Sequence, residues 1–161
     1  MKVIDNFLPD YQFKQIQSIV LSDSIPWTFT NGIARDNFPP ESFQFVHYYF
    51  DDGRLFKDGP SVLAPCLKEL KVGTDFSIKC NLTSRTLFHR KTGWHTDNLP
   101  CSTTSVYYIN TNNGWTEFKK GGKVKSVENR MLIFDSSLEH MGVTCTDQKS
   151  RVVINFNYEN N

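Results

Sequence analysis

The 161-residue sequence has no large excess of one charge, no long apolar run and no closely spaced pair of cysteines. Its 18 basic and 17 acidic side chains give a formal net charge of +1, too small to attract the protein to nucleic acid or an anionic membrane. No apolar stretch approaches the roughly 18 residues that a membrane span needs. The first residues contain no apolar signal segment. We therefore expect a soluble, cytoplasmic protein.

The four cysteines are dispersed along the chain, at Cys66, Cys80, Cys101 and Cys145. A structural zinc site needs clustered thiolates, so this spacing argues against one. Nothing indicates secretion, and reduced, buried thiols that pack as small apolar side chains are the expected state. A Cys–His nucleophile that uses Cys101 or Cys145 would lack any recognisable local signature.

No repeat, low-complexity tract or linker divides the chain, and its length suits one domain, residues 1–161. The first part contains a short strand at Lys2–Asn6 and an amphipathic helix at about 11–22 with Asp10 as its cap. Phe13, Ile16, Ile19 and Val20 form the apolar face of that helix. An extended segment at Phe43–Phe50 and a second helix at about Val62–Leu70 follow.

After residue 72 the pattern changes to short strands separated by turn signals. The predicted strands are Phe76–Asn81, Thr103–Asn110, Val124–Val127, Met131–Phe134 and Val152–Phe156. Early helices followed by strands without regular alternation indicate an α+β domain. We expect a jelly roll, or double-stranded β-helix, at 73–161, with a helical and loop-rich support at 1–72 packed outside it.

The triplet His95-Thr96-Asp97 suggests a metal centre. Residues two apart on an extended chain point to the same side, so His95 and Asp97 can present an imidazole and a carboxylate together. A second imidazole from His140 would complete two nitrogens and one oxygen, the ligand set of non-haem Fe(II) oxygenases. A hydrogen-bonded surface pair is the alternative for His95 and Asp97. The same ligands would also suit zinc or manganese in a cupin-like protein.

Arg151 and Tyr108 are candidates for binding a second carboxylate. A hairpin that turns at Asp147-Gln148 would place Thr144 opposite Arg151, on the face that carries His140. The offset of about 13 Å along the sheet suits a small dicarboxylate that spans from a metal to a guanidinium. A one-residue slip would turn Arg151 outward. In Thr103–Asn110, Tyr108 shares a face with Thr104 and Val106.

From about Asn81 to Asn157 the chain resembles the Fe(II)/2-oxoglutarate dioxygenases of the prolyl-4-hydroxylase type, especially the compact forms of phages and bacteria. The matching pieces are His95-Thr-Asp97, Ser105–Asn110, Asn113–Phe118, Asn129–Phe134, His140-Met-Gly-Val143 and Arg151–Ile154. The entry segment Ile4-Asp-Asn-Phe-Leu-Pro9 is also similar. Where the family often has Gly-Gly before the threonine, this chain has Gly114-Trp115.

The resemblance implies a cofactor, two cosubstrates and residue roles. His95, Asp97 and His140 would be the catalytic iron ligands, and Arg151 would hold the distal carboxylate of 2-oxoglutarate with Tyr108 as its hydroxyl partner. Asn81 or Thr83 would replace a tyrosine that some relatives use on the cosubstrate. O2 and 2-oxoglutarate would then yield succinate, CO2 and a hydroxylated product, and the presence of Asp97 favours hydroxylation over halogenation.

The sequence is compatible with two kinds of substrate: a protein side chain, such as prolyl, or a small molecule. His89, Arg90, Trp94, Asn98 and Trp115 are candidates for the mouth of the site, whereas His47 and His89 also suit structural hydrogen bonding. Nucleic-acid dealkylases of the same superfamily resemble this chain, but they carry a second arginine where it has Asn157. Lysines between 119 and 125 fit a solvated hairpin. A non-catalytic binding module is the remaining alternative.

Overall fold

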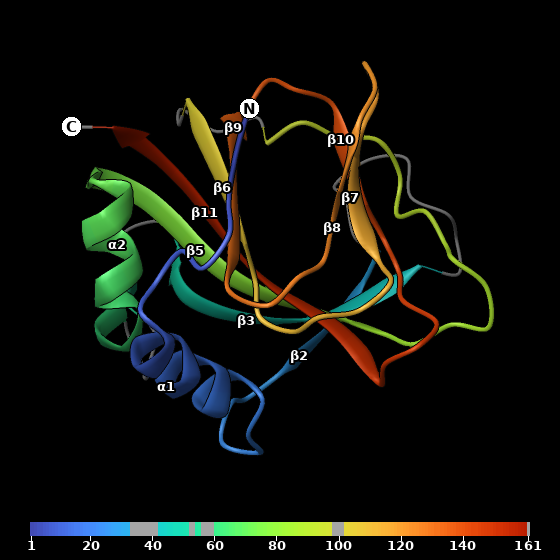
Figure 1. Cartoon of the computed structure of the whole chain (residues 1–161), viewed down its shortest axis with the longest axis horizontal. Coiled ribbons are helices and arrows are strands. Elements are labelled where there is room, and N and C mark those ends of the chain that lie inside the picture. Colours follow the sequence, from blue (N-terminus) through green and yellow to red (C-terminus); the bar gives the residue numbers. More distant parts are fainter. Residues whose placement is uncertain (33–41, 52–53, 56–59, 98–101, 161) are drawn as a thin grey trace.

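Two antiparallel β-sheets form the body of the protein, and two short helices lie outside the larger sheet (Figure 1). The computed structural model describes residues 1–32, 42–51, 54–55, 60–97 and 102–160. The large sheet has eight strands, in the order β1 (Lys2–Ile4), β9 (Arg130–Asp135), β6 (Thr103–Tyr108), β11 (Ser150–Asn160), β5 (Val72–Ser84), β3 (Phe43–Asp51) and β2 (Thr28–Asn31), with β4 (Arg54–Leu55) paired to β3. The small sheet orders β10 (His140–Val143), β7 (Trp115–Phe118) and β8 (Lys123–Lys125).

The large sheet has an apolar outer face and a more polar inner face, because its strands alternate in side-chain direction. Ile78 and Cys80 of β5 pack outward with Ile154 of β11 against the helices. Tyr108 and Val153 belong instead to a second cluster, together with Phe118 of the small sheet. The space between the two sheets is therefore lined by every second residue of each strand. This arrangement is a double-stranded β-helix core, as the strand pattern predicts.

Helix α1 (Asp10–Val20) buries Phe13, Ile16 and Val20 on the outer face of the large sheet. Two details of its prediction were wrong. Asp10 is the first helical residue and forms no capping hydrogen bond, because the Pro9 carbonyl already accepts from the backbone of Gln12 and Phe13. Ile19 is exposed, since it lies at the edge of the apolar face. Among the described residues, no helix is long and apolar enough to cross a membrane.

Helix α2 (Ala64–Leu70) starts two residues later than predicted, because Pro60–Leu63 forms a 3₁₀ turn before it. The turn and the helix bury Leu63 and Leu70 against the core. Strand β5 is much longer than the predicted Phe76–Asn81 and pairs along most of its length with β11.

The predicted pairing of the last two strands was wrong. β10 pairs with β7 in the small sheet, and β11 pairs with β5 and β6 in the large one. The chain between them therefore crosses from one sheet to the other instead of forming a hairpin. Thr144 is not opposite Arg151; its backbone donates a hydrogen bond to Arg90. Arg151 nevertheless reaches the face that His140 occupies, because the two sheets face each other.

Candidate metal centre

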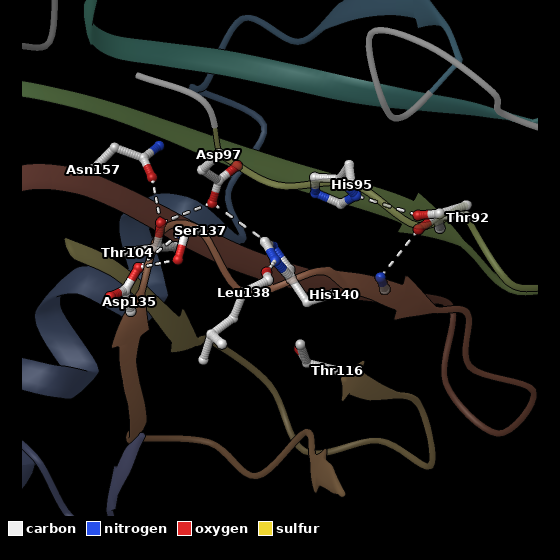
Figure 2. Close-up of polar contacts among 12 residues, drawn as sticks. Thr92, His95, Asp97, Thr104, Thr116, Asp135, Ser137, Leu138, His140 and Asn157 are labelled. Carbon is white, nitrogen blue, oxygen red and sulfur yellow. Dashed lines mark hydrogen bonds and ion pairs between the residues drawn. The ribbon is translucent and has the colours of Figure 1, made fainter. Parts of the chain in front are cut away.

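His95, Asp97 and His140 converge at one point between the sheets, as Figure 2 shows. One ligand atom from each side chain lies within 4.8 Å of the other two. Nε2 of His140 is 3.7 Å from Oδ2 of Asp97, and the two imidazole centroids are 4.4 Å apart. His140 is buried, whereas His95 and Asp97 are half-buried. The sequence motif thus corresponds to a compact group of three metal-ligating side chains.

Hydrogen bonds orient both imidazoles in the same manner. Nδ1 of His140 lies 2.9 Å from the Leu138 carbonyl, and Nδ1 of His95 lies 3.2 Å from the Gly93 carbonyl. A carbonyl can only accept, so Nδ1 carries the proton in each ring. The unprotonated Nε2 of each ring is then available as a ligand. Metal-binding histidines usually donate their other ring N–H to a carbonyl or carboxylate in this way.

Thr104 of β6 orients the carboxylate of Asp97. Its hydroxyl donates to Oδ2 of Asp97 at 2.8 Å and lies 2.8 Å from the amide oxygen of Asn157 (Figure 2). Because one hydroxyl proton cannot serve two acceptors, Asn157 completes the chain when its amide nitrogen faces Thr104. Thr104 and Asn157 are both buried. Neither was predicted for this role, although Thr104 shares the strand face of Tyr108.

Backbone pairing connects the two histidines directly. The amide of His95 donates to the His140 carbonyl at 3.0 Å, and the amide of His140 donates back at 2.9 Å. Thr92 exchanges a similar pair of contacts with Gly142: its amide donates to the Gly142 carbonyl, and its hydroxyl accepts from the Gly142 amide. The segment before Asp97 therefore runs along β10 as a partial extra strand of the small sheet. This pairing holds the ligands together through the backbone.

The surroundings of His140 favour a neutral imidazole. Burial lowers the pKa of His140, the charge of Asp97 opposes this effect, and the nearby His95 and Lys79 add to it. A neutral ring is the form that binds a metal. The ring also packs edge-on against Phe134 at 4.7 Å, which limits its movement.

Arg151 lies on the inner face of β11 and is 6% exposed. Its Nε donates to Ser126 at 3.0 Å and its Nη2 to Thr116 at 3.1 Å, while Tyr108 donates its hydroxyl to the same Thr116 oxygen at 2.8 Å. The guanidinium carbon is 5.6 Å from the centre of the Tyr108 ring. No carboxylate pairs with Arg151 among the described residues. This buried cation therefore lacks a counter-ion, an unfavourable state unless an anion binds.

Gly114 allows the close packing around Arg151. A Cβ at this position would lie 2.7 Å from the Val143 carbonyl oxygen and 2.9 Å from Cδ of Arg151. Gly142 lies on the opposite wall, and a Cβ there would lie 3.6 Å from Nη1 of the same arginine. Residue 114 must therefore be glycine, whereas residue 142 has room for one methyl group. The Gly114-Trp115 pair keeps the glycine that the site needs.

Asn81 and Thr83 line the same interior from β5. Thr83 is directly opposite Arg151 in the strand register, and Asn81 is opposite Val153. The Asn81 amide oxygen and the Thr83 hydroxyl are buried and have no hydrogen-bond partner. Buried polar atoms normally have partners, so both are candidates for contact with a ligand.

The other predicted residues lie outside this group. Nδ1 of His47 contacts the Pro26 carbonyl at 3.1 Å, and Nδ1 of His89 contacts the Thr144 carbonyl at 2.7 Å. Cys66, Cys80 and Cys145 are buried and free, and burial raises their pKa, which opposes thiolate formation. The rings of His89 and Trp115 pack in a tilted arrangement, with their centres 4.7 Å apart. Asn98 and Cys101 lie outside the described residues.

Known structures share this fold at low sequence identity. No family model matches the sequence, and no curated protein matches it. A prolyl-4-hydroxylase from Pseudomonas putida has a TM-score of 0.65 and 13% identity, over 99% of this chain and 92% of that one. A 2OG-Fe(II) oxygenase family oxidoreductase from Burkholderia pseudomallei has a TM-score of 0.69 and 9% identity, over 98% and 84%.

A third structure is a prolyl hydroxylase from Trichoplax adhaerens in complex with a hypoxia-inducible-factor peptide fragment, with a TM-score of 0.65 and 16% identity over 99% and 83% of the chains. At such identities the likeness establishes the fold. The chain therefore has the double-stranded β-helix of prolyl hydroxylases and 2OG-Fe(II) oxygenases, over almost its whole length.

Proposed function

We propose that this protein is an Fe(II)- and 2-oxoglutarate-dependent oxygenase that hydroxylates its substrate and releases succinate and CO2. The observation that carries the proposal is the combination, in one interior, of a His–Asp–His group and a buried arginine that pairs with no carboxylate of the described residues. Two imidazoles and one carboxylate are a suitable donor set for Fe(II). A second, cationic anchor suits a cosubstrate that carries a further carboxylate.

In this proposal His95, Asp97 and His140 hold the iron, which supplies the oxidising chemistry when it is bound together with 2-oxoglutarate and O2. Thr104 keeps the Asp97 carboxylate directed at the metal through its hydrogen bond. The carbonyls of Gly93 and Leu138 keep the Nε2 lone pairs of the two imidazoles free. These residues hold the ligand geometry before the ion arrives.

Arg151 receives the distal carboxylate of 2-oxoglutarate. Two of its nitrogens already donate to Ser126 and Thr116, whereas Nη1 donates to none of the described residues. Thr116 accepts from both Arg151 and Tyr108, so its own proton is left for a further acceptor. Nη1 and the Thr116 hydroxyl are thus two donors for one carboxylate. Asn81 and Thr83 are the nearest candidates on the neighbouring strand for additional contacts.

The decisive test is an anaerobic visible-absorption titration of the metal-free protein with Fe(II) and then with 2-oxoglutarate. A bidentate 2-oxo acid on Fe(II) gives a metal-to-ligand charge-transfer band, which we expect in the wild type. His140→Ala removes a metal ligand and eliminates the band. Arg151→Met retains the band but raises the dissociation constant of 2-oxoglutarate about ten- to a hundredfold, because hydrogen bonds to charged groups contribute about 1.5–3 kcal/mol.

His89→Ala is the matched control, because His89 is exposed and lies outside the three-residue group. It should leave both the band and the affinity unchanged. A wild type that binds Fe(II) but shows no band with 2-oxoglutarate would overturn the proposal and favour a cupin-like metal protein of another kind. Equal 2-oxoglutarate affinity in wild type and Arg151→Met would remove the role given to Arg151.

The substrate of this reaction is a protein side chain, such as prolyl, or a small molecule. The Trichoplax neighbour binds a peptide, which supports including prolyl peptides in a screen. The position where related dealkylases carry a second arginine is Asn157, whose amide faces Thr104 in the interior. That contact provides no cation for a nucleic-acid substrate and supports ranking such substrates last.

A further inference from the structure

Lys79 is a cation on the inner wall of the large sheet that the proposed reaction does not use. It belongs to β5, where Thr83, Asn81 and Lys79 share one strand face by parity. Thr83 pairs with Arg151, and Lys79 pairs with Asn155 two rows further along β11. The next pair, Ser77 with Asn157, leads to the Thr104 hydroxyl that holds Asp97. Lys79 therefore lies level with the metal-ligand end of the interior.

The register of β5 and β11 directs Lys79 toward the end of the interior that holds the metal ligands, and no carboxylate of the described residues is a counter-ion for it. Burial is the main cause of the lowered pKa of His140, and the charge of Lys79 contributes to it. Among the described residues no carboxylate forms an ion pair with Lys79, which is half-buried. Across the strand pair, Asn155 has a buried amide oxygen with no hydrogen-bond partner. The position thus combines an unpaired cation with an unsatisfied polar group.

The net charge of the site indicates that 2-oxoglutarate does not need Lys79. A divalent ion next to Asp97 leaves one positive charge, and Arg151 adds a second. The two carboxylates of 2-oxoglutarate cancel both. Asp97 is the carboxylate of the ligand group, and Glu159, which shares the inner parity of β11, accepts hydrogen bonds from Ser102. No described carboxylate therefore forms an ion pair with Lys79, and its charge remains. A cation beside a divalent metal is unfavourable unless a further anion lies next to it.

We propose that Lys79 binds a carboxylate of the substrate, so that the enzyme acts on acidic molecules whose carboxylate lies on the β5 side of the metal. Asn155 contributes the second polar contact from β11 when its amide nitrogen faces the carboxylate, because an amide oxygen can only accept. This inference rests on the proposed function, since the metal and 2-oxoglutarate set the charge balance. It identifies the substrate class as a carboxylic acid: a free acid, an amino acid or a chain with an acidic group beside the reacting carbon.

The experiment compares matched acids and amides as probes. Protein loaded with Mn(II) and 2-oxoglutarate under nitrogen is titrated with N-acetyl amino acids and with the corresponding N-acetyl amino amides. Line broadening of the probe protons by Mn(II) reports binding near the metal and needs no turnover. In wild type we expect each acid that binds to have an affinity at least about tenfold higher than that of its amide. This ratio corresponds to a difference of roughly 1.4 kcal/mol in binding free energy. Lys79→Met removes this preference, and Lys79→Arg restores it.

The same variants, loaded with Fe(II) in place of Mn(II) under nitrogen, report the affinity for 2-oxoglutarate through the charge-transfer band. We expect Lys79→Met to change that affinity by less than about twofold, or roughly 0.4 kcal/mol. A tenfold loss would mean that Lys79 holds the cosubstrate, and it would overturn the inference. Acids and amides that behave alike in wild type would also overturn it. Absence of the band in wild type itself would contradict the proposed oxygenase function. This measurement therefore distinguishes an error in the proposed function from an error in the role given to Lys79.

Discussion

Thr104 is the residue on which the geometry of Asp97 depends. Its hydroxyl is the side-chain donor to the carboxylate, at 2.8 Å, and it is fully buried. The isosteric change Thr104→Val removes the donor and keeps the volume. Residues that hydrogen-bond a metal ligand typically contribute about ten- to a hundredfold in metal affinity, and we expect a loss of about that size. Competition with a metal indicator dye measures it.

Thr104→Ser keeps the hydroxyl and loses one methyl group, so it is the control for packing. It should retain metal affinity within about threefold, or roughly 0.7 kcal/mol. If Thr104→Val also bound metal like the wild type, Asp97 would be oriented by other contacts, such as its own backbone bond to Ser136.

His140 makes the stability of the metal-free protein depend on pH. Burial lowers its folded-state pKa, with the Asp97 charge opposing and His95 reinforcing the effect. The unfolded imidazole therefore takes up a proton at a higher pH than the folded one. The stability from the neutral ring is present above the unfolded pKa of about 6.5 and is lost as pH falls toward the folded pKa. Urea unfolding at a series of pH values should show this decline.

His140→Gln supplies the comparison, because glutamine does not titrate. We expect the free energy of unfolding of this variant to fall less steeply than that of wild type between about pH 7 and pH 5. Parallel curves for the two proteins would show that other groups cause the decline.

At the scale of the elements, the loop before β7 is adapted to the arginine on β11. Gly114→Ala would place a methyl group 2.7 Å from the Val143 carbonyl oxygen and 2.9 Å from Cδ of Arg151. Overpacking of this kind typically costs about 1–3 kcal/mol. We expect that loss in urea unfolding, together with weaker 2-oxoglutarate binding, because the guanidinium must shift.

Gly142→Ala is the matched change on β10, where the nearest atoms lie 3.6 Å from the added methyl group. Its free energy of unfolding should stay within about 1 kcal/mol of wild type, the usual cost range of a glycine change in a strand. A Gly114→Ala variant that is as stable as Gly142→Ala would show that the loop relaxes away from Arg151.

The elements also show what the sequence can and cannot predict. Period-2 alternation correctly groups Tyr108 with Thr104 and Val106 on one face of β6, which the structure turns to the interior. Alternation is a local property of one strand, so it can be predicted from the sequence of that strand alone. The pairing of β10 with β7 is not local, and the turn residues Asp147-Gln148 suit a hairpin as well as a crossing between sheets.

The candidate site divides in the same way. His95 and Asp97 are two residues apart, and their spacing alone indicates a shared side. The partners of Arg151, by contrast, come from two other parts of the chain: Thr116 from β7 and Ser126 from the segment after β8. A single threonine or serine carries no signal of such a role. Only the register of the sheets brings these hydroxyls to the guanidinium.

At the scale of the whole molecule, the proposed metal and 2-oxoglutarate sites lie between two sheets, so ligand binding should stabilise the entire fold. A ligand at a hundred times its dissociation constant adds about 2.7 kcal/mol to the free energy of unfolding. We expect Mn(II) to raise the melting temperature and 2-oxoglutarate to raise it further when Mn(II) is present. Differential scanning fluorimetry measures both increments.

Variants should affect the Mn(II) and 2-oxoglutarate increments in melting temperature differently. Arg151→Met keeps the Mn(II) increment and loses most of the 2-oxoglutarate increment, whereas His140→Ala loses both. An increment from 2-oxoglutarate that is the same in Arg151→Met would place the cosubstrate elsewhere in the molecule.

Because the backbones of His95 and His140 pair directly, the residues that select a substrate can change during evolution while the metal ligands keep their positions. The backbones of the two histidines pair with each other, and both imidazoles contact main-chain carbonyls, whose positions do not depend on side-chain identity. Neighbouring side chains, among them Lys79 and Asn155, can therefore mutate without moving the two imidazoles. A lineage can exchange one substrate for another through such changes and retain its reaction throughout. Directed evolution for new substrates should begin at these wall positions.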